Sequence, residues 1–139
     1  MTIDEAKELV LQIDQEQRVL KRWIRIKSKG LEWTHLQDED VMNVVSQVTG
    51  ISKKDMRSKN RQSEIVFARN IAMYILNVRL RRTVTSSATR VNRNHSTCIY
   101  GVKVVKDCID IYRKHGLDNG NLIANLCECE ELLSIRPTV

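Results

Sequence analysis

A polar cluster in the second half of the chain carries side chains that hydrogen-bond both to phosphates and to base edges. It runs Arg93-Asn94-His95-Ser96-Thr97 and directly precedes a stretch with helical spacing. At a helix N-terminus the free backbone N–H groups and the dipole favour a phosphate, and Ser96 and Thr97 add hydroxyl donors there. Asn94 presents a donor and an acceptor side by side, which matches adenine N6 and N7, and His95 adjoins it. This arrangement predicts a nucleic-acid site; the alternative for His95 is that it only caps its helix.

A second polar stretch, Arg57-Ser58-Lys59-Asn60-Arg61-Gln62, has no apolar residue to hold it in a core. We therefore expect a basic loop. The negative potential of a narrow minor groove attracts guanidinium groups, so Arg61 is expected to extend into such a groove. Lys59 lies on the same loop and is expected to contact the DNA backbone.

Two polar residues, Arg69 and Asn70, interrupt an otherwise apolar helical stretch. Polar side chains at one edge of such a helix suit phosphate contacts that set the orientation of a protein on DNA. The alternative for Arg69 is a structural salt bridge with Glu64 or with an acidic residue elsewhere in the chain.

The charge is sorted along the chain. The net charge is +6, but residues 51–103 hold twelve basic residues against two acidic ones, a local charge of +10 that leaves −4 for the rest. A folded domain with this distribution has one positive side, the electrostatic footprint of nucleic-acid binding. Within the segment, Arg79, Arg81 and Arg82 are expected to form a solvated helix end.

Several classes of protein are disfavoured. No apolar run approaches the roughly 20 residues that span a bilayer, and the acidic start is unlike a secretory signal, so a cytoplasmic, nucleoid-associated protein without a membrane partner is expected. The four cysteines have no second close pair of Cys or His for zinc, and no Gly-rich phosphate loop occurs, so neither metal, nucleotide nor other cofactor is expected. No Ser/His/Asp or Cys/His arrangement can be identified from spacing, which predicts that the protein is not an enzyme. Aromatic residues make up only 4% of the chain, which disfavours base-stacking modules for single strands.

The elements that must position these residues are helices. Apolar residues recur at threes and fours, and no strand pattern exceeds a few residues. The predicted helices run from Thr2 to Gly30, from an N-cap in Asp38-Glu39-Asp40 to Gly50, from Ser52 to Met56, from Ser63 to about Val78, from Thr83 to Val91, from His95 to Gly116 and from about Asp118 to Ser134. Thr2 and Glu5 have capping-box spacing, and the helix from Ser63 is apolar on more than half its circumference, which predicts a central position. Two helices joined by a short polar turn at 92–95 are typical of a helix-turn-helix.

The segment from Asp40 to about Asp110 resembles the C-terminal DNA-binding domain of the bacterial replication initiator DnaA family. Three blocks carry the resemblance in the family's order: Ser58-Lys59-Asn60-Arg61 for its basic loop, Ala68-Arg69-Asn70-Ile71-Ala72-Met73-Tyr74 for its central helix, and Arg93-Asn94-His95-Ser96-Thr97 for its R-D-H-S-T signature. The chain departs from the pattern at Ser87-Ala88, where Ile-Gly is usual, at Asn92, which replaces a Gly-Gly pair, and at Asn94, which replaces the signature Asp.

The resemblance implies an all-α, Trp-repressor-like helix-turn-helix domain with extra N- and C-terminal helices. It also implies duplex DNA as the partner, with the helix that begins near His95 in the major groove and Arg61 in the adjacent minor groove. We expect a single domain over 1–139: an N-terminal helix and connection at 1–38, the DNA-binding region at 39–112, and a C-terminal helix and tail at 117–139. The family's ATPase domain has no counterpart, so a stand-alone protein is expected.

The leading hypothesis is sequence-preferring binding of double-stranded DNA, in replication control or transcription. The expected contacts come from Lys59, Arg61, Arg69, Asn70, Arg93, Asn94, His95, Ser96 and Thr97. The alternative is a protein-interaction module in which the first and last helices bind a replication protein.

Overall fold

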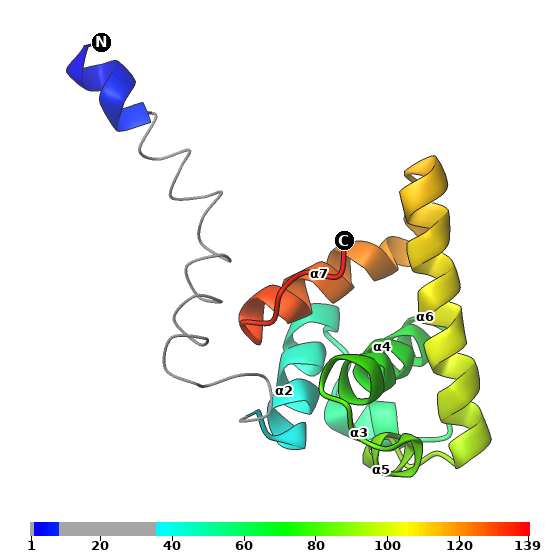
Figure 1. Ribbon diagram of the computed structural model, residues 1–139. Coiled ribbons are helices and arrows are strands. Elements are labelled where there is room, and N and C mark those ends of the chain that lie inside the picture. The colour runs from blue at the N-terminus through cyan, green and yellow to red at the C-terminus, as the bar shows by residue number, and fades with distance from the viewer. Residues whose placement is uncertain (1, 9–35) are drawn as a thin grey trace.

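The computed structural model describes residues 2–8 and 36–139, and the described part contains helices and no strand. Residues 3–8 are helical, and the further helices are α2 (Asp38–Thr49), α3 (Lys53–Arg57), α4 (Ser63–Tyr74), a π-helical turn η2 (Ile75–Arg79), α5 (Val84–Arg90), α6 (His95–His115), a 3₁₀ turn η3 (Asn119–Asn121) and α7 (Leu122–Leu132) (Figure 1). The prediction of an all-α helix-turn-helix fold is confirmed. The predicted first helix beyond residue 8 and most of the connection to α2 lie outside the described residues.

Local capping explains where several helices begin and end. The Thr2–Glu5 capping box is present, since the Glu5 N–H donates to Thr2 Oγ1 at 3.2 Å and the Thr2 N–H donates to Glu5 Oε2 at 3.3 Å. The N-cap of α2 is Gln37 rather than a residue of the acidic cluster that follows it, because Asp40 accepts a hydrogen bond from the Gln37 backbone and completes a capping box. Gly50 and Gly116 end α2 and α6 in the left-handed conformation (φ 74° and 67°), which glycine adopts without steric cost.

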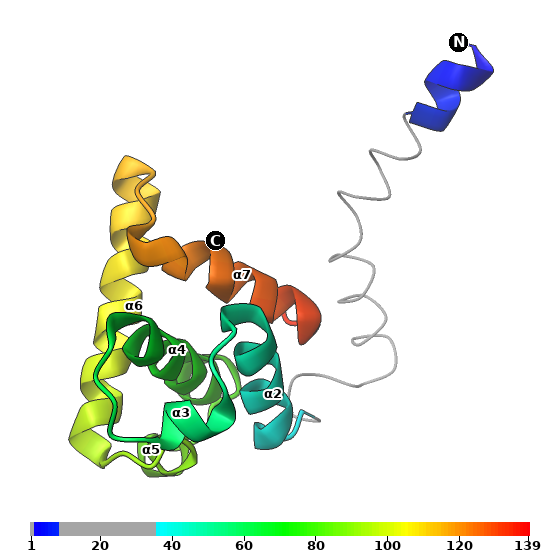
Figure 2. The same ribbon diagram turned by 180° about the vertical axis from the view of Figure 1, so that it is seen from behind.

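The core forms around α4. Helices α2 and α6 pack on either side of α4, and α7 packs on both α2 and α6 (Figures 1 and 2). Nine consecutive residues of α4 and η2, from Ala68 to Leu76, are buried, which confirms the central position predicted for this helix. A helix buried on all sides fixes the positions of the elements that surround it.

Helices α4 and α6 approach each other closely at Gly101. A Cβ atom at this position would lie 2.6 Å from Asn70 Oδ1 and 2.8 Å from Met73 Cε. Any larger residue at position 101 would force the side chains of Asn70 and Met73 to shift, so Gly101 allows α6 to pack closely on α4.

The helix that starts at Ser63 ends in a wider turn than predicted. After Tyr74 the hydrogen-bond pattern becomes π-helical, with the Leu80 N–H donating to Ile75 O at 2.9 Å. The amide of Asn77 then donates to Arg82 O at 3.0 Å, and Arg81 takes a left-handed conformation (φ 57°). These contacts reverse the chain before α5.

The C-terminal tail folds back onto a buried carboxylate. Glu130 of α7 is fully buried, and it accepts hydrogen bonds from the Thr138 hydroxyl at 2.6 Å and from the Thr138 backbone at 3.2 Å. Arg79 forms an ion pair with Glu130 at 3.5 Å and also donates to the Thr138 hydroxyl at 2.9 Å. Burial raises the pKa of Glu130, although the hydrogen bonds from Thr138 and the charge of Arg79 oppose this shift. The prediction that Arg79 lies at a solvated helix end is therefore wrong.

Candidate nucleic-acid interface

Asn94 caps the helix whose N-terminus was predicted to face nucleic acid. Its Oδ1 accepts hydrogen bonds from the Thr97 backbone N–H and from the Thr97 hydroxyl, both at 2.9 Å. Asn94 therefore fills the capping role that was the alternative for His95, and its Oδ1 is already engaged. His95 and Ser96 are exposed on the first turn of α6. The exposed N-terminus of α6 thus presents the backbone donors and polar side chains that recognise phosphates or base edges.

The turn between α5 and α6 is held by a buried residue and a left-handed asparagine. Val91 is fully buried, Asn92 has φ 56°, and the Arg93 N–H donates to Ala88 O at 2.9 Å. Asparagine tolerates the left-handed conformation better than other residues with a Cβ. Asn92 therefore turns the chain between α5 and α6, at the position where the family that this segment resembles has two glycines.

The conformation of the basic loop, residues 57–62, is stabilised by hydrogen bonds between neighbouring residues of the loop. The Asn60 N–H donates to Ser58 Oγ at 3.2 Å, and the Gln62 N–H donates to Asn60 Oδ1 at 2.9 Å. Lys59 and Arg61 are exposed, and neither forms an ion pair within the described part of the chain. The loop therefore presents two cations to solvent on a backbone that its own side chains order.

Arg69 holds this loop from inside the core. It is 4% exposed, and its guanidinium donates to Met56 O and Asn60 O, both at 2.6 Å, to Ser58 O at 2.7 Å and to Asp55 O at 3.4 Å. Burial lowers the pKa of Arg69, and the nearby charge of Arg93 adds to this shift.

The structure corrects the phosphate contacts expected of Arg69 and Asn70. Arg69 directs its donors into backbone carbonyls, and neither Glu64 nor another carboxylate is its partner among the described residues. Asn70 is 6% exposed and its Oδ1 lies where α4 meets Gly101 of α6. Both side chains position the site from within, because they face the protein rather than solvent.

Three hydrogen bonds join the basic loop to the helix-turn-helix. Arg57 Nε donates to Arg90 O at 3.1 Å, Asn92 Nδ2 donates to Arg57 O at 3.4 Å, and Arg93 Nη2 donates to Ser58 O. The loop that carries Lys59 and Arg61 is thus fixed next to the N-terminus of α6. Sequence reasoning missed the parts played by Arg57, Arg90 and Asn92, because nothing local marks residues that bond to carbonyls distant in the sequence.

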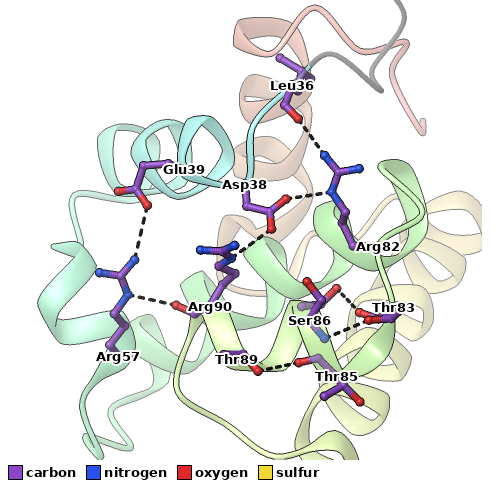
Figure 3. Close-up of polar contacts among 11 residues, drawn as sticks. Leu36, Asp38, Glu39, Arg57, Arg82, Thr83, Thr85, Ser86, Thr89 and Arg90 are labelled. Atoms are coloured by element: carbon purple, nitrogen blue, oxygen red, sulfur yellow. Dashed lines mark hydrogen bonds and ion pairs between the residues drawn. The ribbon is translucent and has the colours of Figure 1, made fainter.

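Four of the twelve cations counted in the positive segment pair with carboxylates at the start of α2, and Figure 3 shows the pairs of Arg57, Arg82 and Arg90. Asp38 accepts from Arg82 at 2.8 Å and from Arg90 at 3.0 Å. Glu39 pairs with Lys53 at 2.7 Å and with Arg57 at 3.5 Å, and the hydrogen bond from Lys53 is the main cause of its lowered pKa. The expected solvated position of Arg82 is therefore wrong.

Fewer cations stay exposed and unpaired than the twelve basic residues of the segment 51–103 would suggest. The exposed cations of the segment that form no ion pair with described residues are Lys54, Lys59, Arg61, Arg93 and Lys103, with Arg93 half-buried. Lys59 and Arg61 lie on the basic loop and Arg93 on the turn that contacts it, whereas Lys54 lies on α3 and Lys103 farther along α6.

The thiols and carboxylates show no second chemical site in the described residues. The four cysteines are free, and burial raises the pKa of each thiol, that of Cys129 to about 12. No group of three His, Cys, Asp or Glu side chains there is arranged to hold a metal ion. None of the described helices has the length and apolar character needed to cross a membrane.

A short helix, a tight turn and a second helix with an exposed polar N-terminus beside a cationic loop define a helix-turn-helix domain of the DNA-binding class. Residues 39–105, just under half of the chain, match the family described as bacterial dnaA protein helix-turn-helix, and this segment is a DnaA-like helix-turn-helix domain. The matched region contains the basic loop, α4, α5 and the first half of α6.

Curated relatives agree with this assignment. The chain is 32% identical over 71 residues to the chromosomal replication initiator protein DnaA of Thermotoga petrophila, a match that covers 51% of this chain and 16% of that protein. It is 30% identical over 98 residues (70% of this chain, 22% of the relative) to the DnaA of Thermotoga sp. strain RQ2, and 23% identical over 113 residues (81% and 23%) to that of Bacteroides fragilis. The chain thus spans less than a quarter of the length of these relatives. No solved structure matches the chain.

Proposed function

We propose that this domain binds double-stranded DNA with a sequence preference, placing the N-terminus of α6 in the major groove and Arg61 in the adjacent minor groove. The observation that carries the proposal is the set of hydrogen bonds from Arg57, Asn92 and Arg93 that fixes the basic loop beside α6. Two reading elements held at a constant separation can contact neighbouring grooves of one duplex at the same time.

Each exposed group has a distinct part in this proposal. His95 and the free Nδ2 group of Asn94 contact base edges, while the backbone of the first α6 turn and the Ser96 hydroxyl hold a phosphate. Thr97 acts through Asn94, because its N–H and its hydroxyl both donate to Asn94 Oδ1 and orient that side chain. Arg61 reads the width of the minor groove, and Lys59 contacts phosphate. Arg93 contributes its charge where it adjoins Ser58, and Arg69 and Asn70 act only through the positions of the loop and of α6.

The process proposed is replication control or transcription in the cytoplasm, on the nucleoid. The relatives are named chromosomal replication initiators, which favours control of replication. DNA binding by this domain uses neither a nucleotide nor a metal and includes no catalytic step. Accordingly, ATP is expected to leave DNA affinity unchanged.

The test combines selection of duplexes from a random pool with binding at several salt concentrations. Each phosphate that is neutralised contributes about −0.9 to the slope of log K against log salt, so roughly four contacts give a slope of about −3 to −4. A slope near zero, or recovery of random sequences, would contradict the proposal. The expected slope of log K against log salt is shallower than twelve free cations would give. The reason is that the cations paired with Asp38, Glu39 and Glu130 keep these partners in the complex and do not contact phosphates.

A protein-interaction role is the second candidate, favoured by exposed apolar residues away from the basic loop. Leu117 is 63% exposed and Leu132 of α7 is 42% exposed. A module that acts only through these residues would elute from heparin at low salt, whereas the proposed DNA-binding domain is expected to be retained until the salt concentration is high.

A further inference from the structure

The second turn of α6 exposes two large apolar side chains next to the proposed reading residues. Ile99 is 51% exposed and Tyr100 is 69% exposed. They share one stripe with the exposed Ser96 and Lys103, because residues spaced by three, four and seven positions lie on the same face of a helix. The opposite face, which includes Cys98 and Val105, is buried in the core and fixes the stripe toward solvent.

Ile99 also forms part of a shallow hollow between α5, η2 and α6. The hollow has a volume of about 320 Å³ and is lined by Val84, Ile99 and Val102, with Asn77, Lys103 and Lys106 as its polar members. Apolar residues bordered by lysines suit a ligand that combines an apolar group with nearby negative charge.

In the major groove, that combination is a thymine. The thymine C5-methyl is the apolar group that base pairs present there, and phosphates border the groove on both sides. With a rise of 1.5 Å per residue, Ile99 lies about 6 Å along α6 from His95, a distance comparable to two base-pair steps. A major groove that receives the N-terminus of α6 therefore also receives its second turn.

We propose that Ile99, flanked by Tyr100, contacts thymine methyl groups in the major groove and so specifies thymine next to the bases read by the N-terminus of α6. This inference rests on the proposed DNA binding and adds an apolar determinant to it. Apolar side chains of this size exposed beside polar and basic ones are typical of contact surfaces.

Uracil substitution tests the proposal, because uracil differs from thymine only by the methyl group. In the duplex recovered from the random pool, each thymine is replaced singly by uracil and affinity is measured by fluorescence anisotropy. Loss of one buried methyl group is expected to weaken wild-type binding about fourfold at one or two positions. Ile99→Ala is expected to bind the thymine and uracil duplexes equally at those positions. When one of these thymines is replaced by cytosine, the protein is expected to bind that duplex more tightly once the cytosine is changed to 5-methylcytosine.

Matched controls lie on the same helix. Ile111 is 44% exposed and Tyr112 is 36% exposed, near the end of α6 that projects beyond the rest of the domain (Figure 1). Ile111→Ala and Tyr112→Ala are expected to keep the full sensitivity to uracil, whereas Tyr100→Ala reduces it. Thermal melting followed by circular dichroism verifies that all four variants fold.

The possible outcomes separate this inference from the proposed function. Equal wild-type binding of every thymine and uracil pair, a preferred site without thymine, or unchanged uracil sensitivity in Ile99→Ala would overturn the inference and leave DNA binding intact. Absence of any salt-dependent duplex binding would overturn both.

Discussion

Arg69 and Arg93 donate hydrogen bonds to the same acceptor, the carbonyl oxygen of Ser58. One arginine reaches it from the buried central helix and the other from the turn that precedes α6. The position of the basic loop is therefore set from two sides, and any movement of Ser58 breaks a bond to the core or a bond to the helix-turn-helix. This shared acceptor ties the basic loop both to the core and to the turn that precedes α6.

Replacing Arg69 is expected to destabilise the fold. Arg69→Met removes four hydrogen bonds and takes the guanidinium donor away from the carbonyls of Met56 and Asn60, whereas Ser58 O keeps its bond from Arg93. The loss is expected to cost about 3 kcal/mol of unfolding free energy in urea denaturation. Arg61→Ala is the control, since its exposed side chain is expected to change stability by less than about 0.5 kcal/mol. If Arg69→Met instead kept full stability and lost affinity for all sequences alike, Arg69 would be a phosphate contact.

Capping and base reading by Asn94 can be separated with two substitutions. Asn94→Ala is expected to lose about 1 kcal/mol of stability, because the bonds to Thr97 disappear, whereas Asn94→Ser keeps an N-cap of similar quality. Both variants lack the amide donor, so both are expected to lose about 1 to 3 kcal/mol of preference for the selected duplex over random DNA.

Equilibrium binding to the two duplexes provides the measurement. Retention of the preference by Asn94→Ser would show that Asn94 acts only as a cap.

Arg61 is expected to respond to the width of the minor groove. Arg61→Ala should weaken binding more on sites flanked by A·T pairs than on the same sites flanked by G·C pairs, because narrow A-tract grooves concentrate negative potential. Arg61→Lys should recover only part of the loss, since a strongly hydrated ammonium is harder to desolvate. Lys59→Ala is the matched control on the same loop, and it is expected to lose the same affinity for sites flanked by A·T pairs as for sites flanked by G·C pairs. Equal losses for Arg61 as well would assign it to general phosphate contact.

The buried carboxylate of Glu130 predicts an unusual dependence of stability on pH. Burial raises the folded-state pKa of Glu130, so the folded protein binds more protons than the unfolded chain above the unfolded pKa of about 4.3. The wild-type protein therefore loses stability relative to Glu130→Gln as the pH rises from this value through the folded pKa. Urea denaturation of both proteins at several pH values measures the difference.

Glu39→Gln serves as the contrasting variant. The pKa of Glu39 is lowered, mainly by the hydrogen bond from Lys53, so its contribution to stability is present above the unfolded pKa and is lost as the pH falls. For Glu130, the contrary result would be a wild-type free energy of unfolding that increases with pH relative to that of Glu130→Gln. That result would mean that the ion pair with Arg79 outweighs the desolvation of Glu130.

The local features of this fold could be predicted from the sequence. The capping box of Thr2 and Glu5, the stops at Gly50 and Gly116 and the polar loop after Met56 depend on neighbours within a few residues, and the structure has them where the pattern indicates. The apolar circumference of the helix from Ser63 likewise predicted its central place. Only the width of its last turn differed, because the hydrogen bond from Asn77 to Arg82 O and the left-handed backbone of Arg81 turn the chain into α5.

The burial and the bonding partners of individual polar residues were decided only by the tertiary structure. The sequence led us to expect DNA contacts from both Arg69 and Arg61. In the structure Arg69 is buried and donates to four carbonyl groups, whereas Arg61 is exposed. Likewise, Asp38 neutralises Arg82 and Arg90 across long separations in the chain. Hydrogen bonds and ion pairs act over about 3 to 4 Å, so their partners depend on which distant segments the core brings into contact. Composition determined how much positive charge this protein carries, and packing around α4 determined where that charge is left exposed.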